Sequence, residues 1–164
     1  MNRIEKGSLL VLAIIVAFNI FFGLGSIPLL DPDEPVYAET AREMIQFNDY
    51  LSPRIYNEYW FDKPPMYYWL VAGAMHVFGD GEFAARFPAA LMAFLTVIML
   101  YCSITRLFNE RTGFWSALVL ATSVQFFYLG KAAVTDTTLL FFLTGSLLCY
   151  LHKQYWLVYV CWPR

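Results

Sequence analysis

Charged residues are scarce in this sequence. They make up 15% of its 164 residues, while 59% of the residues are apolar and 19% are aromatic. A soluble globular domain has about a quarter charged residues. The formal charge is −2 and the basic residues form no cluster, which excludes a nucleic-acid partner. The composition therefore predicts a protein whose main solvent is a lipid bilayer.

Residues that form disulfides and metal sites are also few. The three cysteines, Cys102, Cys149 and Cys161, lie in or beside apolar segments without a paired spacing, so we predict neither a disulfide framework nor a cysteine metal knuckle. Two histidines, His76 and His152, are too few for a histidine-rich metal site. The sequence also lacks a glycine-rich phosphate loop, an internal repeat and a low-complexity run. The main remaining feature is a set of long apolar runs.

The long apolar runs predict an all-α integral membrane protein. Residues 7–30 contain no charged side chain, and neither do residues 87–105 and 112–130. A helix rises about 1.5 Å per residue and needs about 20 apolar residues to cross a hydrocarbon core of roughly 30 Å. A further apolar run begins near Thr137. We therefore predict about four transmembrane helices, near residues 8–30, 87–107, 112–130 and 137–157.

The first apolar run has a second interpretation, which is a cleaved signal peptide. Arg3 and Lys6 precede it, and Gly23, Gly25 and Ser26 are small residues of the kind found at cleavage sites. The apolar part is longer than a usual signal core, and further charge-free runs follow it. We therefore favour a retained membrane span.

Met66–Phe78 is an apolar stretch of 13 residues, which is short for a membrane crossing. We predict that it lies flat in the membrane interface. The chain then crosses once before Asp33 and twice more before Asp136, so that the two acids share one side of the membrane. If this stretch crossed instead, it would separate them. The density of basic residues beside the spans favours the flat arrangement, with a cytoplasmic N-terminus and an extracytoplasmic loop 31–86 in the plasma (inner) membrane.

A second interfacial helix is predicted at the start of this loop. Pro35 suits the first turn of a helix. The apolar face of the helix then consists of Tyr37, Ala41, Met44 and Ile45. Acids at a helix start accept free backbone N–H groups and complement the helix dipole, for typically about 0.3–1 kcal/mol each. This is one explanation of Asp33 and Glu34, and it leaves the rest of the loop unexplained.

Four motifs, in their order along the chain, resemble a known family. They are DPDEPVYAETAREM, YLSPRIYNEYWFDKPPMYYWL, EFAARFPAAL and KAAVTDTTLLFF. Together they are similar to the N-terminal part of the polytopic glycosyltransferases of the GT-C type, which take a sugar from a polyprenyl phosphate. The nearest members are the bacterial aminoarabinose transferases that act on lipid A, and protein O-mannosyltransferases are more distant. The resemblance runs from about Pro28 to Leu143, and it implies that residues 1–164 are the N-terminal part of such a domain, with catalytic loop 31–86 and with the C-terminal remainder missing.

The resemblance also implies roles for single residues. Asp33 matches the catalytic carboxylate of the first loop, and Asp136 matches the second acidic position. Lys63 matches a lysine that engages the donor phosphate. Asp62 stands where relatives have a glutamate implicated in metal binding, so the resemblance allows a divalent metal at Asp62 without requiring this cofactor. Glu34 would support Asp33.

Elementary chemistry accounts for these residue types. A sugar on polyprenyl phosphate already has a good leaving group, so the reaction needs a cation that stabilises the departing phosphate more than it needs a proton donor. We predict that Lys63 supplies this charge, helped by Arg54 or Lys131. Arg42 lies in the first motif and is a second-rank candidate for the donor or lipid phosphate. A carboxylate on the other face of the sugar takes or orients the proton of the acceptor.

Simpler explanations exist for several residues. Asp136 could cap the fourth span, and Arg86 could anchor the second span among lipid headgroups. Tyr67, Tyr68 and Trp69 could be aromatic anchors in the membrane interface.

The sequence predicts an enzyme that transfers a glycosyl group from a polyprenyl-phosphate-linked sugar to a lipid or protein acceptor at the extracytoplasmic face. Its partners would be this donor, the acceptor and membrane lipids. Two alternatives remain open. One is a non-catalytic membrane protein that binds or transports polyprenyl phosphates, and the other is an inactive truncated fragment of the enzyme.

Overall fold

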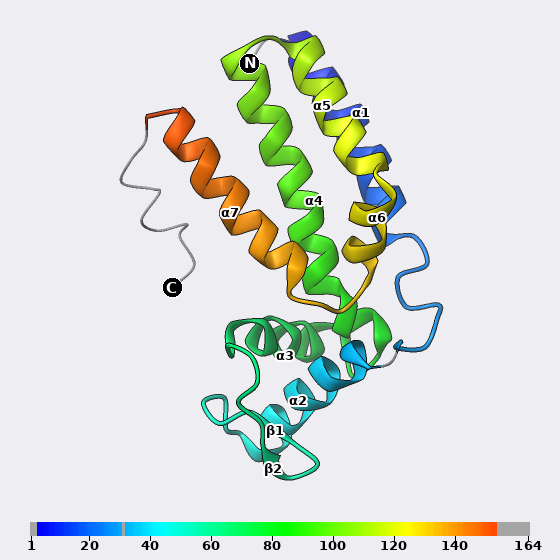
Figure 1. The fold of residues 1–164 in the computed structure, drawn as a ribbon. Coiled ribbons are helices and arrows are strands. Elements are labelled where there is room, and N and C mark those ends of the chain that lie inside the picture. The colour runs from blue at the N-terminus through cyan, green and yellow to red at the C-terminus, as the bar shows by residue number, and fades with distance from the viewer. Residues whose placement is uncertain (1–2, 31, 154–164) are drawn as a thin grey trace.

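The computed structural model describes residues 3–30 and 32–153, and within them the chain forms seven helices and one two-stranded hairpin. The elements in chain order are α1 (Arg3–Phe21), α2 (Asp33–Phe47), β1 (Arg54–Ile55), β2 (Glu58–Tyr59), α3 (Met66–Phe78), α4 (Glu82–Leu107), α5 (Glu110–Thr122), α6 (Val124–Lys131) and α7 (Asp136–Leu151). Helices α1, α4, α5 and α7 stand side by side as a bundle, and α2, α3 and the hairpin lie together at one end of it (Figure 1). Helix α4 contacts each of the other helices, so it is the central element.

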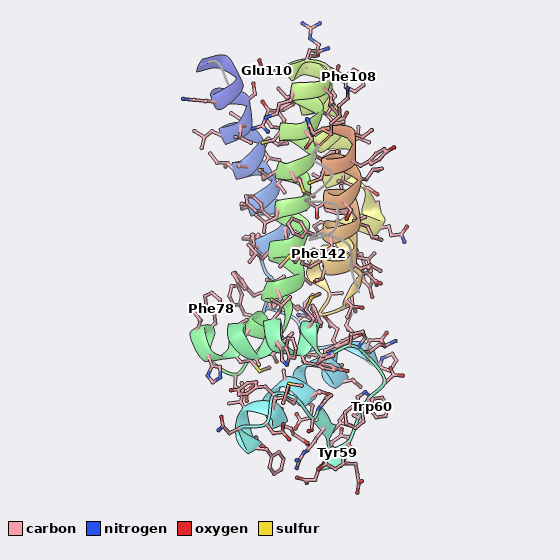
Figure 2. The ribbon with its side chains drawn as sticks, turned by 90° about the vertical axis from the view of Figure 1, so that its left-hand side faces the viewer. Tyr59, Trp60, Phe78, Phe108, Glu110 and Phe142 are labelled. Atoms are coloured by element: carbon pink, nitrogen blue, oxygen red, sulfur yellow. The ribbon has the colours of Figure 1, made fainter. Side chains whose placement is uncertain are left out.

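The predicted second span corresponds to α4. This helix has 26 residues, and among the described residues it is the one helix that is long and apolar enough to cross a membrane by itself. The connection after α4 is a short turn in which the Asn109 side chain accepts a hydrogen bond of 2.9 Å from Thr112 N. Phe108 and Glu110 of this turn lie at the opposite end of the molecule from Tyr59 and Trp60 (Figure 2).

The segment predicted as the third span, residues 112–130, is interrupted in the structure. The segment forms two helices, α5 and α6, with a bend of 65° between them. Ser123 interrupts the helix because its backbone is extended, with φ −64° and ψ 127°. The Thr122 hydroxyl donates to Leu118 O at 2.8 Å, a local bond that often bends helices. A charge-free run indicates that a segment is apolar, but it does not indicate where the helix is interrupted.

The first span is shorter than predicted. Its apolar run extends to Leu30, but helix α1 ends at Phe21. Gly23 follows with φ +69°, a left-handed conformation that glycine adopts without strain, and Pro28 lies in the linker that leads to α2. Residues 6–21 and α7 are both apolar but shorter than 18 residues, so the described chain contains one helix of spanning length, or two if the bent pair counts as one span. The last part of the span predicted near residues 137–157 lies outside the described residues.

The two helices predicted in the loop are present, and α3 has the predicted bounds Met66–Phe78. Helix α3 lies across the axis of α4 instead of continuing the bundle (Figure 1). The apolar face of α2 does not point away from the protein, because Tyr37, Ala41 and Met44 are buried in one core with α3 residues. Tyr67 and Tyr68 belong to the same core, with exposed fractions of 2% and 0%, so they are not interfacial anchors. Trp69, the next residue in the chain, is exposed and fits the role of an interfacial anchor better.

A second core holds the bundle together. It contains Leu12, Val16 and Ile20 of α1 and a row of small α4 residues that includes Ala90 and Ala93. The small residues allow the neighbouring helices to approach α4 closely. The tightest place is Gly113 of α5, where an added Cβ would lie 2.2 Å from Thr105 Oγ1, 3.0 Å from Thr105 N and 3.1 Å from Tyr101 O.

Replacing Gly113 with alanine is therefore expected to destabilise the bundle by about 1–3 kcal/mol, because the new methyl group would push against the α4 backbone. Gly73 is a matched control, since it also lies inside a helix but has nothing within 4 Å of an added Cβ. Gly73→Ala is expected to stabilise the protein by up to about 1 kcal/mol through helix propensity. Unfolding in detergent micelles, followed by tryptophan fluorescence, measures both effects. Equal stabilities of the two variants would contradict the close packing of α5 on α4.

Candidate functional site

A buried ion pair between Arg86 of α4 and Glu34 of α2 organises the end of the bundle next to α2 and α3. Both side chains are about 95% buried, with exposed side-chain fractions of 5% and 4%. Arg86 Nε donates to Glu34 Oε1 at 2.9 Å and Arg86 Nη2 donates to Glu34 Oε2 at 2.7 Å. This paired geometry is the strong form of an arginine–carboxylate interaction. The suggestion that Arg86 anchors the span among headgroups is therefore wrong.

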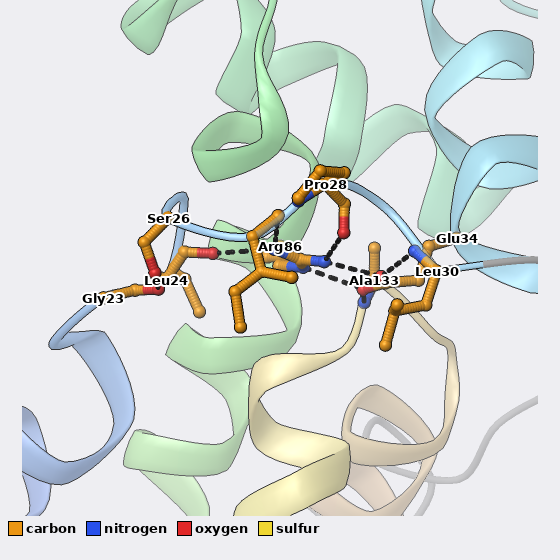
Figure 3. A network of polar contacts seen from close by, with 9 residues as sticks. Gly23, Leu24, Ser26, Pro28, Leu30, Glu34, Arg86 and Ala133 are labelled. Atoms are coloured by element: carbon orange, nitrogen blue, oxygen red, sulfur yellow. Dashed lines mark hydrogen bonds and ion pairs between the residues drawn. The ribbon is translucent and has the colours of Figure 1, made fainter.

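Arg86 also holds the linker between α1 and α2. Its Nη1 donates to Leu24 O at 3.1 Å and to Ile27 O at 2.6 Å, and its Nη2 donates to Pro28 O at 2.9 Å (Figure 3). Buried carbonyl groups of a non-helical segment need such partners, because leaving one unpaired costs about 1–3 kcal/mol. One guanidinium thus satisfies a carboxylate and three linker carbonyls at the same time.

Glu34 connects a third segment to this cluster. Its Oε2 accepts a hydrogen bond of 2.7 Å from Leu30 N, and its Oε1 accepts one of 2.6 Å from Ala133 N, in the connection between α6 and α7 (Figure 3). Pro32 at the start of α2 makes no side-chain cap bond. Glu34 is therefore not a simple helix-start acid. It is the residue at which the linker, α4 and the α6–α7 connection meet.

The environment of Glu34 favours its charged form. Burial disfavours the carboxylate, but the hydrogen bonds from Arg86 and from the backbone of Leu30 and Ala133 oppose burial and outweigh it, so that the pKa of Glu34 lies below its ordinary value of 4.5. The carboxylate has two hydrogen bonds at each oxygen. It is thus fully engaged, which suits a supporting role and not that of a base.

The two predicted catalytic acids begin helices next to this cluster. Asp33 is the first residue of α2 and directly precedes Glu34, and Asp136 is the first residue of α7 and follows Ala133 by three positions. Both residues are exposed. Because Glu34 bonds to the Ala133 backbone, it ties the two acidic segments to the same end of the bundle.

Tyr67 of α3 is buried in the core that α3 shares with α2. Its side chain is 2% exposed, and its hydroxyl has no hydrogen-bond partner within the described part of the chain. Burial is the main cause that raises the pKa of Tyr67, and Tyr37, Glu34 and Asp136 add to it in that order. Tyr37, Tyr67 and Ala133 belong to one core, so the α6–α7 connection lies against α2 and α3.

Lys63 remains available for a ligand. It precedes α3, is about half exposed and forms a long ion pair, 3.6 Å, with Asp62 Oδ2. No three His, Cys, Asp or Glu side chains come together anywhere in residues 3–30 and 32–153. A metal at Asp62 stays a prediction, and no step proposed below uses one.

Arg42 is engaged in a structural contact. It donates from Nε and Nη2 to the two oxygens of Asp80, at 2.7 and 2.9 Å, and it also pairs with Glu39. These bonds join α2 to Asp80, two residues after the end of α3. Glu43, the other side chain beside Arg42, is buried and accepts hydrogen bonds of 3.2 Å from Asn57 N.

Arg54 is likewise held within the hairpin region. Its Nη2 donates to Asp49 Oδ2 at 3.2 Å. Its guanidinium lies 4.9 Å from the ring centre of Phe47 and 4.8 Å from that of Tyr59. Its Nε is buried without a partner in the described residues. Like Arg42, this side chain already has a carboxylate partner, which weakens its candidacy for the donor phosphate.

Lys131 lies at a different place from Lys63. It ends α6, and its Nζ donates to Phe22 O at 2.8 Å and sits 4.7 Å from the centre of the Phe127 ring. It lines a pocket of about 400 Å³ together with Glu34 and Arg86. Lys63 is not among the residues that line this pocket.

Sequence reasoning named Arg86 as a headgroup anchor and missed its buried ion pair, although a signal for this pair was present. Arg86 follows Glu82 in the motif EFAARFPAAL and lies directly before the charge-free run that begins at Phe87. A charge at the end of a membrane segment often faces a partner within the protein. The acidic start of α2 supplies that partner, but it is 52 residues away in the chain.

Known proteins and structures resemble this chain. A family model described as dolichyl-phosphate-mannose-protein mannosyltransferase matches residues 62–162. An undecaprenyl phosphate-alpha-4-amino-4-deoxy-L-arabinose arabinosyl transferase of Yersinia enterocolitica is 33% identical over 150 residues, which cover 90% of this chain and 27% of that protein. A second protein of this description, from Proteus mirabilis, is 29% identical over 149 residues, with the same coverage of 90% and 27%. The chain thus spans about a quarter of the length of these relatives.

Two crystal structures of ArnT from Cupriavidus metallidurans have a similar fold. The structure in the apo state aligns with a TM-score of 0.81 and 26% identity, over 87% of this chain and 27% of that chain. The structure bound to undecaprenyl phosphate also aligns with a TM-score of 0.81 and 26% identity, over 87% of this chain and 26% of that chain.

Proposed function

Because this chain belongs to the family described as dolichyl-phosphate-mannose-protein mannosyltransferases, we propose that it forms the N-terminal part of an enzyme that transfers a sugar from a polyprenyl phosphate. The arabinosyl transferases that resemble it are named for a donor in which an amino sugar is joined to undecaprenyl phosphate. We propose a donor of this class, a lipid acceptor such as lipid A, and a pentosyl group as the transferred unit.

The observation that carries the proposal is the hydrogen bond between Glu34 and the Ala133 backbone. This bond, supported by Arg86, keeps the segments of Asp33 and Asp136 at one end of the bundle. A reaction that uses two carboxylates requires such proximity. Both carboxylates are exposed and open to a substrate, whereas Glu34 is buried.

In the proposed mechanism, Asp33 orients the acceptor oxygen and accepts its proton where the acceptor is protonated, with Asp136 assisting. The acceptor oxygen forms a bond to the anomeric carbon while the bond from that carbon to the phosphate oxygen breaks. The electron pair of the broken bond stays on the phosphate. The Lys63 side chain is about half exposed, so it can contact a bound phosphate and stabilise this negative charge.

The proposed placement in the membrane follows from the same mechanism. The N-terminus would be cytoplasmic, and the loop that carries Asp33, Lys63 and helix α3 would face the extracytoplasmic side of the plasma (inner) membrane. The α2–α3 unit would lie at the headgroups, where a polyprenyl phosphate presents its sugar. The position of α3 across the end of the bundle supports this arrangement (Figure 1).

A chimeric enzyme tests the proposed function. The 150-residue segment of the Yersinia enterocolitica transferase that matches this chain is replaced by the corresponding residues of this chain, and the chimera is expressed in cells that lack their own transferase. We expect it to add the amino sugar to lipid A, as detected by mass spectrometry. Lys63→Gln should abolish the product and Lys153→Gln, at the opposite end of α7, should not. A chimera that is inserted at parental levels but makes no product would contradict the proposal, as would full activity of Lys63→Gln.

A further inference from the structure

The pocket beside Lys131 has one charged end and apolar walls. Its volume is about 400 Å³, within the range of small-molecule sites. Phe22, Ile27, Leu30 and Phe127 supply apolar side chains, and Lys131 supplies a cation. Phe22 directly follows α1 and Lys131 ends α6, so the pocket lies at the same end of the bundle as α2 and α3.

Lys131 differs from its neighbours in having no carboxylate partner. Four other basic side chains at this end of the described chain each lie within 4.0 Å of a carboxylate; they are Arg42, Arg54, Lys63 and Arg86. Lys131 has no such ion pair among the described residues, and its ammonium contacts a backbone carbonyl and an aromatic ring. Glu34 lines the same pocket, but Arg86 and two backbone N–H groups already occupy its oxygens. The positive charge of Lys131 is therefore open to an anion.

We propose that this pocket binds the phosphate headgroup of an anionic glycerophospholipid from the surrounding bilayer. Lys131 is the counter-ion of the phosphate, and the apolar walls formed by Phe22, Ile27 and Leu30 contact the first carbons of an acyl chain. Charge and shape both fit this ligand, because Arg86 and Glu34 in the lining neutralise each other, and an amphiphile with one negative group matches the remaining cation, Lys131, and the apolar walls. The site lies at the end of the spans, where headgroups are found.

The geometry separates this site from the proposed donor site. Neither Asp33 nor Asp136 lines the pocket, and Lys63 does not line it. Glu34 is the one carboxylate among the described residues that line the pocket, and it is fully engaged, so the lining offers no free acid for transfer. The lipid therefore has a structural role, in which it fills the space between the α1–α2 linker and α6. This inference does not depend on glycosyl transfer, because its test measures lipid binding alone.

Native mass spectrometry of the purified chain tests the site. The chain is transferred from nanodiscs of phosphatidylglycerol and phosphatidylcholine in equal amounts into detergent, and the retained lipid is counted. We expect phosphatidylglycerol to be retained over phosphatidylcholine, and Lys131→Gln to reduce its retention roughly fivefold, the effect of one lysine near a membrane surface. Lys131→Arg should keep the lipid, and Lys153→Gln is the control for charge elsewhere. Unchanged retention in Lys131→Gln overturns the proposal.

Occlusion and competition identify the ligand. Ile27→Trp fills the pocket while leaving Lys131 in place, so it should also release phosphatidylglycerol; retention in this variant overturns the proposal even if Lys131→Gln does not fold. Soluble glycerol phosphate should not displace the lipid. Displacement by glycerol phosphate would mean that the pocket is a free-phosphate site, and displacement by an equal amount of undecaprenyl phosphate would mean that it belongs to the donor. Either displacement contradicts a glycerophospholipid site.

Discussion

Replacement of Arg86 by methionine is expected to destabilise the folded chain by about 3–5 kcal/mol, which is the usual cost of removing one partner from a buried ion pair. The change leaves the Glu34 carboxylate without its guanidinium, and it also leaves the carbonyls of Leu24, Ile27 and Pro28 without their donor. Unfolding in mixed micelles with increasing dodecyl sulfate, followed by circular dichroism, measures the loss.

Arg42→Met is the matched control for this prediction. Arg42 also pairs with carboxylates, but its side chain is 37% exposed, and pairs near the surface contribute only about 0–1 kcal/mol. The double variant Arg86→Met with Glu34→Leu should recover part of the stability, because it removes the unpaired charge, but not all of it, because the linker carbonyls stay unpaired. Equal losses for Arg86→Met and Arg42→Met would refute the organising role of Arg86.

The same ion pair is expected to make the stability of the folded chain depend on pH. The pKa of Glu34 in the folded protein lies below its ordinary value of 4.5. The contribution of Glu34 to stability is therefore fully present above about pH 4.5 and is lost as the pH falls through the lower, folded-state pKa. In Glu34→Gln this contribution is absent at every pH, so its stability should decrease less on acidification than that of the unchanged chain.

Replacement of Asp33 by asparagine is expected to lower glycosyl transfer by about 10²–10⁴-fold in the chimeric enzyme, the usual contribution of a general base. Asp33 is exposed, and asparagine has nearly the same shape, so folding should be unchanged. Binding of undecaprenyl phosphate should also be retained, because a carboxylate does not attract a phosphate. Transfer is measured by mass spectrometry of lipid A, and binding is measured by native mass spectrometry.

Glu58→Gln provides the control for a lost negative charge, since Glu58 is an exposed acid of strand β2. This variant should transfer at the unchanged rate. The pair of measurements also separates an enzyme from a protein that only binds or transports polyprenyl phosphates. If the protein only binds polyprenyl phosphates, Asp33→Asn should leave this binding unchanged and there is no transfer to lose. Full transfer by Asp33→Asn would contradict a catalytic role of Asp33.

Composition and local pattern were enough to predict the elements that depend on short-range features. The bounds of α3 follow from one apolar stretch behind two prolines, and α2 begins where the acids and Pro35 place it. The end of α1 and the bend at Ser123 were not predicted, because both lie inside charge-free runs and depend on the backbone of single residues. Hydropathy alone carries no information about such breaks.

The partners of the site residues were harder to predict than the residues themselves. Asp33, Asp136 and Lys63 were identified by resemblance, and their roles remain proposals. The contacts of Glu34 with Arg86 and Ala133 could not be predicted, because these partners are 52 and 99 residues away in the chain. A helix-start acid and an acid in a buried ion pair look the same in the sequence. Only the packing of α2 against α4 distinguishes them.

The contacts of Glu34 also fix the order in which this end of the molecule is completed during synthesis. Glu34 leaves the ribosome first, Arg86 follows 52 residues later, and Ala133 comes last, 99 residues after Glu34. Until Arg86 is made, the acid and the linker carbonyls depend on water or on other partners. Until Ala133 is made, the two acidic segments are not joined. The first loop is therefore made well before the segments that hold it, and Glu34 gains the last of these partners only after α6 has been made.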